Sequence, residues 1–386
     1  MEEMKQKEQT MIAAAIPELE TPALVIDLDA MERNLRRMAD YFAARPCKLR
    51  PHAKTHKCPI IARRQVELGA LGITCAKIGE AEVMAGGGIQ DILIANEVVG
   101  ASKILRLAAL ARRCTMTVAL DNLDNARAVG QAAREAGTTV GVLIEVDTGL
   151  GRCGLPPRPD AVIAFAREAI RIPGLRFRGL MGYEGHTVLL TDPVERRAKA
   201  EDAGRLLLEC VEPLRRVGVA VECVSGGGTG TYDITSQLTL QPTHVPGKTD
   251  EPAPQFSEIQ AGSYVFMDAR YRQVRQEFEN ALFLATTVVS RPTADRVILD
   301  AGMKSATHEF GLPVVYGRTD IEVANLSEEH VKCMVKGEGC ELRPGDQVWL
   351  LPSHCCTTVN LHDRYWCVRE GRLVDTWPIS ARGKFA

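Results

Sequence analysis

Short apolar runs alternate with amphipathic segments through most of the chain. The run Ala23–Leu28 is typical of a strand, and Asp29–Ala44 carries apolar residues at helical spacing, so together they predict a first strand-helix unit. Eight such units predict an α/β fold built on a parallel (β/α)8 TIM barrel rather than an open sheet. The other strands are predicted at Leu49–Ala53, Gly72–Cys75, Asp91–Ala95, Thr115–Leu120, Val140–Val146, Arg176–Met181 and Val219–Val224, with helices near Asn122–Glu135, Asp160–Ile170 and Pro193–Val217.

The pattern changes near Asn280, where strand-like segments follow one another without helices between them, which predicts an antiparallel β domain. The segment from Thr235 to Ser257 is rich in proline and has no clear period, so we expect a long loop there. The predicted organisation is an N-terminal arm at 1–20, a barrel at 21–275 and a β domain at 276–386, on which the arm is a candidate to pack. The β-domain strands are predicted at Leu282–Val289, Arg296–Leu299, Gln347–Leu351, Trp366–Arg369 and Leu373–Trp377.

Composition narrows the classes of partner and compartment. A chain of 386 residues suits one large barrel with a second domain, and 47 basic against 49 acidic residues give no reason to expect nucleic acid or a membrane surface as partner. Twelve cysteines without a CxxC pair favour reduced thiols in the cytoplasm. The apolar patch Met11–Ile16 is too short for a signal sequence or a membrane span.

The segment from Arg50 to Lys57 holds a lysine between two histidines, just before a predicted helix. With a period of two, His52 and Lys54 share one face of a strand with Lys48 and Arg50. A lysine that forms a Schiff base needs a pKa lowered by burial or by nearby positive charge, and this cluster supplies the charge. Lys54 is therefore a candidate catalytic residue, and an ordinary surface lysine is the alternative.

A glycine-rich stretch follows the predicted strand Val219–Val224. The residues from Ser225 to Thr231 read Ser-Gly-Gly-Gly-Thr-Gly-Thr, in which backbone N–H groups can converge on an anion and hydroxyls add further donors. The stretch matches neither the Walker motif nor the dinucleotide fingerprint. Because barrels commonly hold a phosphate after a late strand, we expect phosphate binding here, with a plain flexible loop as the alternative.

Two further groups have the residue types of a binding site. Arg152 follows a strand with acidic residues and a glycine turn, and either a ligand contact or a structural salt bridge would explain it. His354 and Cys356 lie two residues apart and could share a metal, for which imidazole and thiolate favour zinc, while core packing is the alternative.

Taken together these residues resemble the fold-type III pyridoxal-phosphate enzymes of the D-threonine aldolase and D-serine dehydratase family. The resemblance runs from Thr21-Pro22 to Ser380-Ala381-Arg382-Gly383. It implies an alanine-racemase-like barrel, a C-terminal β domain, a homodimer and a divalent metal (zinc, manganese or magnesium) beside pyridoxal 5'-phosphate. The motifs that carry it, in the same order, are Arg-Pro-His-Ala-Lys-Thr-His-Lys-Cys, Gly-Gly-Gly-Thr-Gly, Gln260-Ala261-Gly262-Ser263-Tyr264, Leu299-Asp300-Ala301-Gly302 and the late histidine segment.

The resemblance also implies roles for individual residues. Lys54 would bind the cofactor as a Schiff base, Arg152 would contact the pyridoxal ring, and Tyr183 would line the pocket. His354 and Cys356 would be the metal ligands, although Cys355 is an alternative to its neighbour. Tyr183 and His186 are further candidate catalytic residues, and the other candidate cofactor contacts are His52, Ser225, Gly227, Gly228, Thr229, Gly262, Ser263 and Tyr264.

The implied substrate is a D-β-hydroxy-α-amino acid, for which two reactions compete. Retro-aldol cleavage to glycine and an aldehyde is favoured by the overall match, including the segment Glu258–Tyr264. Dehydration to a 2-oxo acid and ammonia is favoured by Cys356, where similar aldolases typically carry aspartate, and by the position of His186. We take the aldolase reaction as the leading hypothesis and the dehydratase as its alternative. An amino-acid racemase and a non-enzymatic pyridoxal-phosphate carrier are weaker hypotheses.

Overall fold

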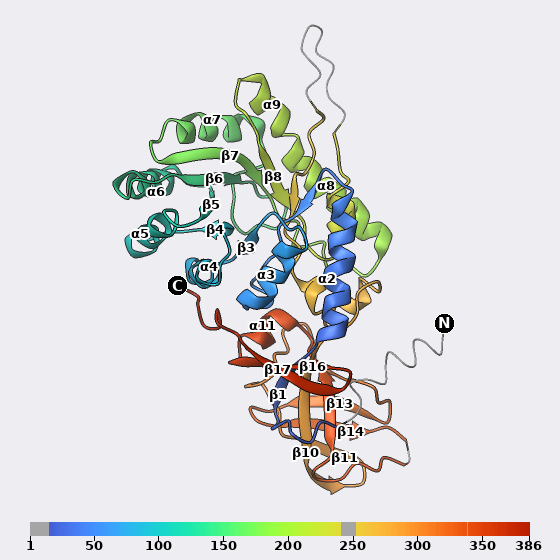
Figure 1. Cartoon of the computed structure of the whole chain (residues 1–386). Coiled ribbons are helices and arrows are strands. Elements are labelled where there is room, and N and C mark those ends of the chain that lie inside the picture. The colour runs from blue at the N-terminus through green and yellow to red at the C-terminus, as the bar shows by residue number, and fades with distance from the viewer. Residues whose placement is uncertain (1–14, 241–251, 338) are drawn as a thin grey trace. The chain divides into compact units, whose positions relative to one another are not determined.

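The computed structural model describes residues 15–240, 252–337 and 339–386, in two units (Figure 1). The barrel unit contains Met38–Lys54, Pro59–Gly262 and Lys384–Ala386, and the sheet unit contains 15–37, Thr55–Cys58 and Ser263–Gly383. The predicted barrel limits of 21 and 275 therefore move to 38 and 262. Residues 1–14 of the predicted arm and 241–251 of the predicted long loop lie outside the described residues.

The barrel unit is built on an eight-stranded parallel sheet in the order β2-β9-β8-β7-β6-β5-β4-β3. A single parallel bridge between His52 and Thr74 links the two ends of this order. Strand β6 is buried along its whole length, as expected for a parallel strand that is covered on both faces. The strands are β2 (Lys48–Leu49), β3 (Ile73–Cys75), β4 (Asp91–Glu97), β5 (Thr115–Leu120), β6 (Val140–Glu145), β7 (Leu175–Met181), β8 (Cys223–Gly226) and β9 (Glu258–Ile259).

The predicted number of barrel strands is right, but one member of the set is wrong. The strand predicted first, β1 (Ala23–Asp27), pairs antiparallel with β10 (Leu282–Thr293) and parallel with β16 (Arg364–Arg369), so it belongs to the sheet unit. Strand β9 takes the eighth place in the barrel, between β2 and β8. Two residues are too few for a periodicity to show, and the continuous apolar run of β1 suits a buried strand of either sheet.

Helices connect the barrel strands and lie outside the sheet (Figure 1). The chain supplies the expected N-terminal signals, since the side chains of Asn122 and Asp192 accept hydrogen bonds from the first amides of α6 and α8. The helix predicted over Pro193–Val217 is divided into α8 and α9. The helices are α2 (Leu28–Ala43), α3 (Pro59–Glu67), α4 (Ile78–Gly86), α5 (Ala101–Leu110), α6 (Leu123–Glu135), α7 (Pro159–Ile170), α8 (Pro193–Leu208), α9 (Val211–Arg216) and α10 (Tyr232–Thr235).

The sheet unit is built on a second sheet in the order β13-β14-β11-β10-β1-β16-β17, to which β15 is joined through β10 and β12 through β15. Its pairings are antiparallel except that of β1 with β16, which confirms the predicted antiparallel domain. Ile16 and Leu19 pack in its core, so the described end of the predicted arm lies against this domain. The remaining elements are β11 (Arg296–Leu299), β12 (Val314–Val315), β13 (Ile321–Leu326), β14 (Val331–Val335), β15 (Gln347–Leu351), β17 (Arg372–Pro378), α11 (Cys355–Val359), and the short 3-10 helices η1 (Ser263–Val265) and η2 (Tyr271–Gln273).

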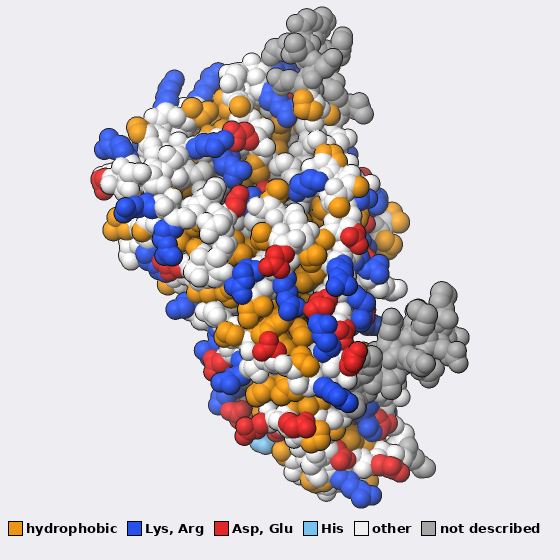
Figure 2. Space-filling view, viewed as in Figure 1, with side chains coloured by type: hydrophobic (Ala, Val, Ile, Leu, Met, Phe, Trp, Pro, Cys, Tyr) orange, Lys and Arg blue, Asp and Glu red, His pale blue; other side chains and the backbone are white. Residues whose placement is uncertain are grey.

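Surface charge and helix length bear on possible partners. Basic and acidic side chains are interspersed over the face drawn in Figure 2. Among the described residues, no helix has the length and apolar character needed to cross a bilayer.

Strand β1 supports a prediction about stability. Ile26 is fully buried and pairs with Leu282 on one side and Cys367 on the other. We expect Ile26→Ala to lower the free energy of unfolding of the sheet unit by about 2–5 kcal/mol, because the truncation leaves a cavity. Urea unfolding followed by tryptophan fluorescence measures this loss. The control is Val374→Ala on β17, where the side chain is exposed and the midpoint should not move; equal shifts would contradict the placement of β1.

Candidate functional site

Lys54 lies shortly after the C-terminal end of strand β2 in the barrel unit. Strand β2 ends at Leu49, earlier than predicted, but the backbone continues in strand-like contact because His52 N–H donates to the Ala261 carbonyl over 3.2 Å and Ala53 N–H to the Thr74 carbonyl over 2.8 Å. The Lys54 N–H donates to Nδ1 of His52 over 3.4 Å. The predicted candidates Lys54 and His52 are thus held at the edge where barrel active sites lie.

Arg50 does not supply the free positive charge that the sequence suggested. Its buried guanidinium donates to Glu258 and to Asp91, each over 2.8 Å. Burial works against the charged form, but Glu258 and Asp91 outweigh it and raise the pKa of Arg50. The two carboxylates therefore compensate the charge of Arg50. The arginine joins Glu258 of β9 to Asp91 of β4 rather than acting on Lys54.

Three strand ends bring Lys54, Tyr183 and Arg152 together within the barrel unit. Lys54 Nζ and Arg152 Cζ each lie 5.9 Å from the centroid of the Tyr183 ring. A Cβ placed on Gly228 would lie 3.3 Å from Cε2 of the same ring, so the glycine-rich loop also lies against it. Sequence reasoning found all four residues, and the tyrosine ring is the surface on which they meet.

The loop after β8 packs so closely that its glycines are required. Gly227 has φ +76°, a left-handed conformation that favours glycine. A Cβ on Gly230 would overlap the carbonyl oxygen of Val188. Thr229 is buried, and the Ser225 hydroxyl accepts a hydrogen bond from the Gln260 side chain over 2.8 Å. The loop is a cradle of backbone without side-chain obstruction, which fits a phosphate group.

Glu184 accepts hydrogen bonds from this loop and from α10, a role that the sequence did not indicate. Its buried carboxylate accepts hydrogen bonds from the Gly227 N–H over 3.2 Å and from the hydroxyls of Thr231 and Thr235, each over 2.6 Å. The only sequence signal was its place next to Tyr183. The carboxylate of Glu184 therefore joins the glycine-rich loop to α10.

Replacing Glu184 by glutamine should therefore weaken binding of a phosphorylated ligand to this loop. The amide has one acceptor oxygen where the carboxylate has two, so one buried donor loses its partner, and we expect Kd for pyridoxal 5'-phosphate to rise about tenfold. Fluorescence titration of the apoprotein measures this constant. Glu195→Gln, on the exposed side of α8, is the matched control. An unchanged Kd for the Glu184 variant would contradict this role of the carboxylate.

The remaining predicted residues lie elsewhere. His186 is exposed beside the glycine turn, with its Cε1 3.3 Å from a Cβ placed on Gly149, and it makes no hydrogen bond among the described residues. Gly262 ends the barrel unit and Ser263 begins η1. Tyr264 is buried with its ring centroid 5.9 Å from that of Phe278, so its ring packs in the core of the sheet unit.

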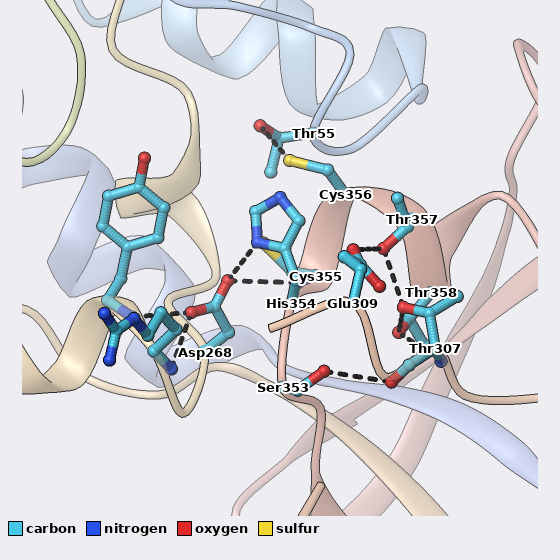
Figure 3. A network of polar contacts seen from close by, with 12 residues as sticks. Thr55, Asp268, Thr307, Glu309, Ser353, His354, Cys355, Cys356, Thr357 and Thr358 are labelled. Atoms are coloured by element: carbon cyan, nitrogen blue, oxygen red, sulfur yellow. Dashed lines mark hydrogen bonds and ion pairs between the residues drawn. The ribbon is translucent and has the colours of Figure 1, made fainter. Parts of the chain in front are cut away.

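A second group of site residues lies in the sheet unit, at the start of α11 (Figure 3). One ligand atom from each of His354, Cys355 and Cys356 lies within 4.8 Å of the others. Asp268, which is fully buried, bonds to Nδ1 of His354 over 2.9 Å and accepts the Cys355 N–H over 3.1 Å. This leaves Nε2 of His354 for a metal, an arrangement typical of histidine ligands. Sequence reasoning had not assigned Asp268 to the site.

The two cysteines that the sequence left as alternative ligands differ in environment. Cys356 is half-buried, with its Sγ 3.3 Å from the hydroxyl of Thr55. Cys355 is fully buried, and hydrogen bonding to Cys356 together with burial raises its pKa. On this difference we base the proposal that Cys356 is the thiolate ligand.

Charge at His354 also fits a cation site. Burial would lower its pKa, but Cys356 and Asp268 outweigh burial and raise it to about 11. These two neighbours favour positive charge on the imidazole, and a divalent cation bound at Nε2 would supply positive charge in its place. The ring of Phe310 lies edge-on at 4.8 Å from His354 and forms an apolar wall beside it.

Comparison with known proteins gives consistent matches over the whole chain. Residues 26–239 match the family described as alanine racemase, N-terminal domain, and residues 281–368 match the putative serine dehydratase domain. The chain is 39% identical to a 3-hydroxy-D-aspartate aldolase of Paracoccus denitrificans and 41% identical to a D-threonine aldolase of Arthrobacter sp, in each case over 95% of this chain and 93% of the relative.

Solved structures agree with these relatives. The D-threonine aldolase of Filomicrobium marinum is 39% identical and superposes with a TM-score of 0.87 over 96% of this chain and 97% of its own. A D-threo-3-hydroxyaspartate dehydratase is 28% identical, with a TM-score of 0.81 over 94% of this chain and 97% of its own. That structure is a variant with one cysteine replaced by alanine, and it is described as the metal-free form.

Proposed function

The chain belongs to the alanine-racemase-like family of lyases that includes D-threonine aldolases and 3-hydroxy-D-aspartate aldolases, and we propose that it cleaves D-β-hydroxy-α-amino acids to glycine and an aldehyde. The observation that carries the proposal is the metal-ligand group at α11, in which Asp268 orients His354 and Thr55 contacts Cys356. Thr55 directly follows Lys54 in the chain. A cation and a reactive lysine are the two groups that a metal-assisted retro-aldol cleavage requires.

The barrel residues fit pyridoxal 5'-phosphate. Lys54 supplies the primary amine for the aldehyde of the cofactor, and Tyr183 and Arg152 lie beside it to contact the ring. The phosphate would be held by Ser225, Gly227, Gly228 and Thr229, with further contacts proposed for His52 and Gly262. When bound, pyridoxal phosphate accepts electron density from Cα and a divalent metal acts as a Lewis acid towards the β-hydroxyl.

The residues of the chain would bind the cation and transfer the protons of the reaction. His354 and Cys356 hold the cation, and the buried carboxylate of Asp268 keeps the imidazole in one orientation. The mixed imidazole and thiolate donor set favours zinc over manganese or magnesium. His186 is the candidate to take the proton of the β-hydroxyl, and Lys54 is proposed to give a proton to Cα of the glycine that remains. Loss of the β-hydroxyl proton accompanies cleavage between Cα and Cβ.

A second candidate function is dehydration of the same substrate class to a 2-oxo acid and ammonia. It is favoured by Cys356, because similar aldolases typically carry aspartate at this position. The identities of 39% and 41% with aldolases against 28% with the dehydratase place it second. Formation of pyruvate and ammonia from D-serine would support dehydration.

We also propose a cytoplasmic homodimer. All twelve cysteines are free, which suits a reducing compartment. The resemblance to fold-type III enzymes is the basis for the dimer. Light scattering of the purified protein at several concentrations tests it, and a monomer at micromolar concentration would contradict it.

The synthetic direction of the reaction tests the proposed function. Retro-aldol cleavage is reversible, so the holoenzyme with zinc should convert glycine and acetaldehyde into β-hydroxy amino acids of D-configuration at Cα. Chiral chromatography identifies the products, and a chelator should prevent their formation. Products of L-configuration, or none when the cofactor is demonstrably bound, would exclude the proposal.

A further inference from the structure

Three acidic residues lie at the carboxyl ends of three neighbouring barrel strands. Glu97 ends β4, Asp121 follows β5, and Glu145 ends β6. Asp121 has a partner, because its carboxylate accepts the Gly154 N–H over 3.0 Å. Glu145 is deeply buried, with only 5% of its side chain exposed. Burial of carboxylates at such density is unfavourable unless their charge is reduced or paired.

Two carboxylate oxygens in this group have no hydrogen-bond donor. Oε1 of Glu97 and Oε2 of Glu145 are both buried, and no described residue donates to either. The two side chains are nevertheless within hydrogen-bonding reach of each other. Two ionised carboxylates within hydrogen-bonding reach repel each other. A single proton shared between them would instead give each of these two oxygens a hydrogen-bond partner.

The other carboxylate oxygen of Glu145 lies near Arg152, the candidate contact of the cofactor ring. Oε1 of Glu145 lies 3.6 Å from Nη2 of Arg152. Arg152 is half-exposed, and its guanidinium also lies 5.9 Å from the centroid of the Tyr183 ring. The guanidinium of Arg152 therefore lies near both the buried carboxylate of Glu145 and the ring of Tyr183.

We propose that Glu97 and Glu145 share one proton and, as a singly charged pair, position Arg152 for the ring of the bound cofactor. The identity of that ligand rests on the proposed function. Glu97 and Glu145 are positioning residues, since they act through Arg152. One negative charge on the pair balances the guanidinium, whereas two charges would draw Arg152 towards the acids and away from the ring.

The ionisation of the pair gives the proposal a measurable signature. Burial and then Glu97 raise the pKa of Glu145 to about 8, while Arg152 lowers it and Asp121 raises it further. The Cys153 thiol faces the same group, and its own pKa is raised by burial and by Glu97. A carboxyl with a raised pKa keeps its proton below about pH 8 and releases it above, so the pair gains its second charge on the alkaline side.

Two variants of the pair test this inference in the holoenzyme. Glu97→Gln donates a permanent N–H to Glu145 and mimics the singly charged pair. We expect it to keep Kd for pyridoxal phosphate within about twofold at pH 7 and to abolish the change in cofactor absorption near pH 8. Glu145→Gln removes the anion beside Arg152, so Kd should rise about tenfold and the absorption maximum should shift at all pH values.

Controls separate this inference from the proposed function. Glu222→Gln removes a comparable partner of Arg176, at 2.9 Å on the surface, and should alter neither constant nor spectrum. A wild-type protein that binds no cofactor would contradict the proposed function. If cofactor binds normally, equal Kd values and identical pH profiles in the wild type and both variants would overturn only the shared-proton pair.

Discussion

Replacing Lys54 by alanine is expected to lower kcat by more than about a thousandfold, the largest effect of any single substitution in the barrel unit. Lys54 is the proposed source of the primary amine, and its Nζ lies 5.9 Å from the centroid of the Tyr183 ring. The same variant should lose the visible absorption that the lysine-bound cofactor gives the wild type. Lys54→Arg should be as inactive, because it keeps the positive charge but not the nucleophilic amine. Steady-state kinetics and absorption spectra of dialysed protein measure both effects.

Lys48→Ala is the matched control for these variants. Its ammonium, on strand β2, donates to the carbonyls of Phe42 and Ala43 at the end of α2, so its loss should affect stability slightly and kcat by less than about twofold. Full turnover in Lys54→Ala would remove the basis of the proposed function, whatever metal is bound.

Cys356→Ala should remove the bound metal and lower kcat by at least about a hundredfold. The thiolate is one of two proposed protein ligands, and its loss leaves His354 as the only one. Metal content after dialysis against zinc-containing buffer, measured by plasma mass spectrometry, should fall from about one ion per chain to a small fraction of that. Excess zinc should restore part of the activity, because a water molecule can replace the missing ligand.

Cys355→Ala distinguishes the two adjacent thiols. Cys355 is buried and donates to its neighbour, so its truncation should cost about 1 kcal/mol of stability while the metal is retained. The reverse result, in which Cys355→Ala loses the metal and Cys356→Ala keeps it, would exchange the two roles. Retention of metal by both variants would show that the cation is bound elsewhere.

The overall architecture was accessible from the sequence because parallel and antiparallel regions differ in their local pattern. The alternation of apolar runs with amphipathic helices predicted the parallel barrel, and the change near Asn280 predicted the second sheet, which the structure confirms. The assignment of single strands was less secure. Strand β1 is apolar and buried in either setting, while β9 is formed by pairing with β2 and β8, which are far from each other in the chain. A short stretch of sequence therefore shows neither which sheet β1 joins nor that β9 forms a strand.

The candidate site divides in the same way. Lys54, the glycine-rich loop, and His354 with Cys356 could be proposed because their residue types suggest chemistry on their own. Asp268 and Thr55 could not, since aspartate and threonine are common and these two become informative only beside His354 and Cys356, 86 and 301 residues away. Glu184 was equally inconspicuous until its contacts with the loop were known.

The positive charge that the sequence predicted around Lys54 was overestimated. The arginine at position 50 was counted as a free cation because the strand pattern placed it on the same face. In the folded chain two carboxylates compensate it. Charge inferred from sequence neighbours therefore overstates the local potential whenever a buried ion pair forms with distant residues.

The most direct test of the account is the product mixture that the holoenzyme with zinc forms from D-threonine. Glycine and acetaldehyde should appear in equal amounts, and a chelator should abolish both. Accumulation of 2-oxobutanoate and ammonia in their place would contradict the aldolase proposal and would assign the metal at His354 and Cys356 to the departure of hydroxide.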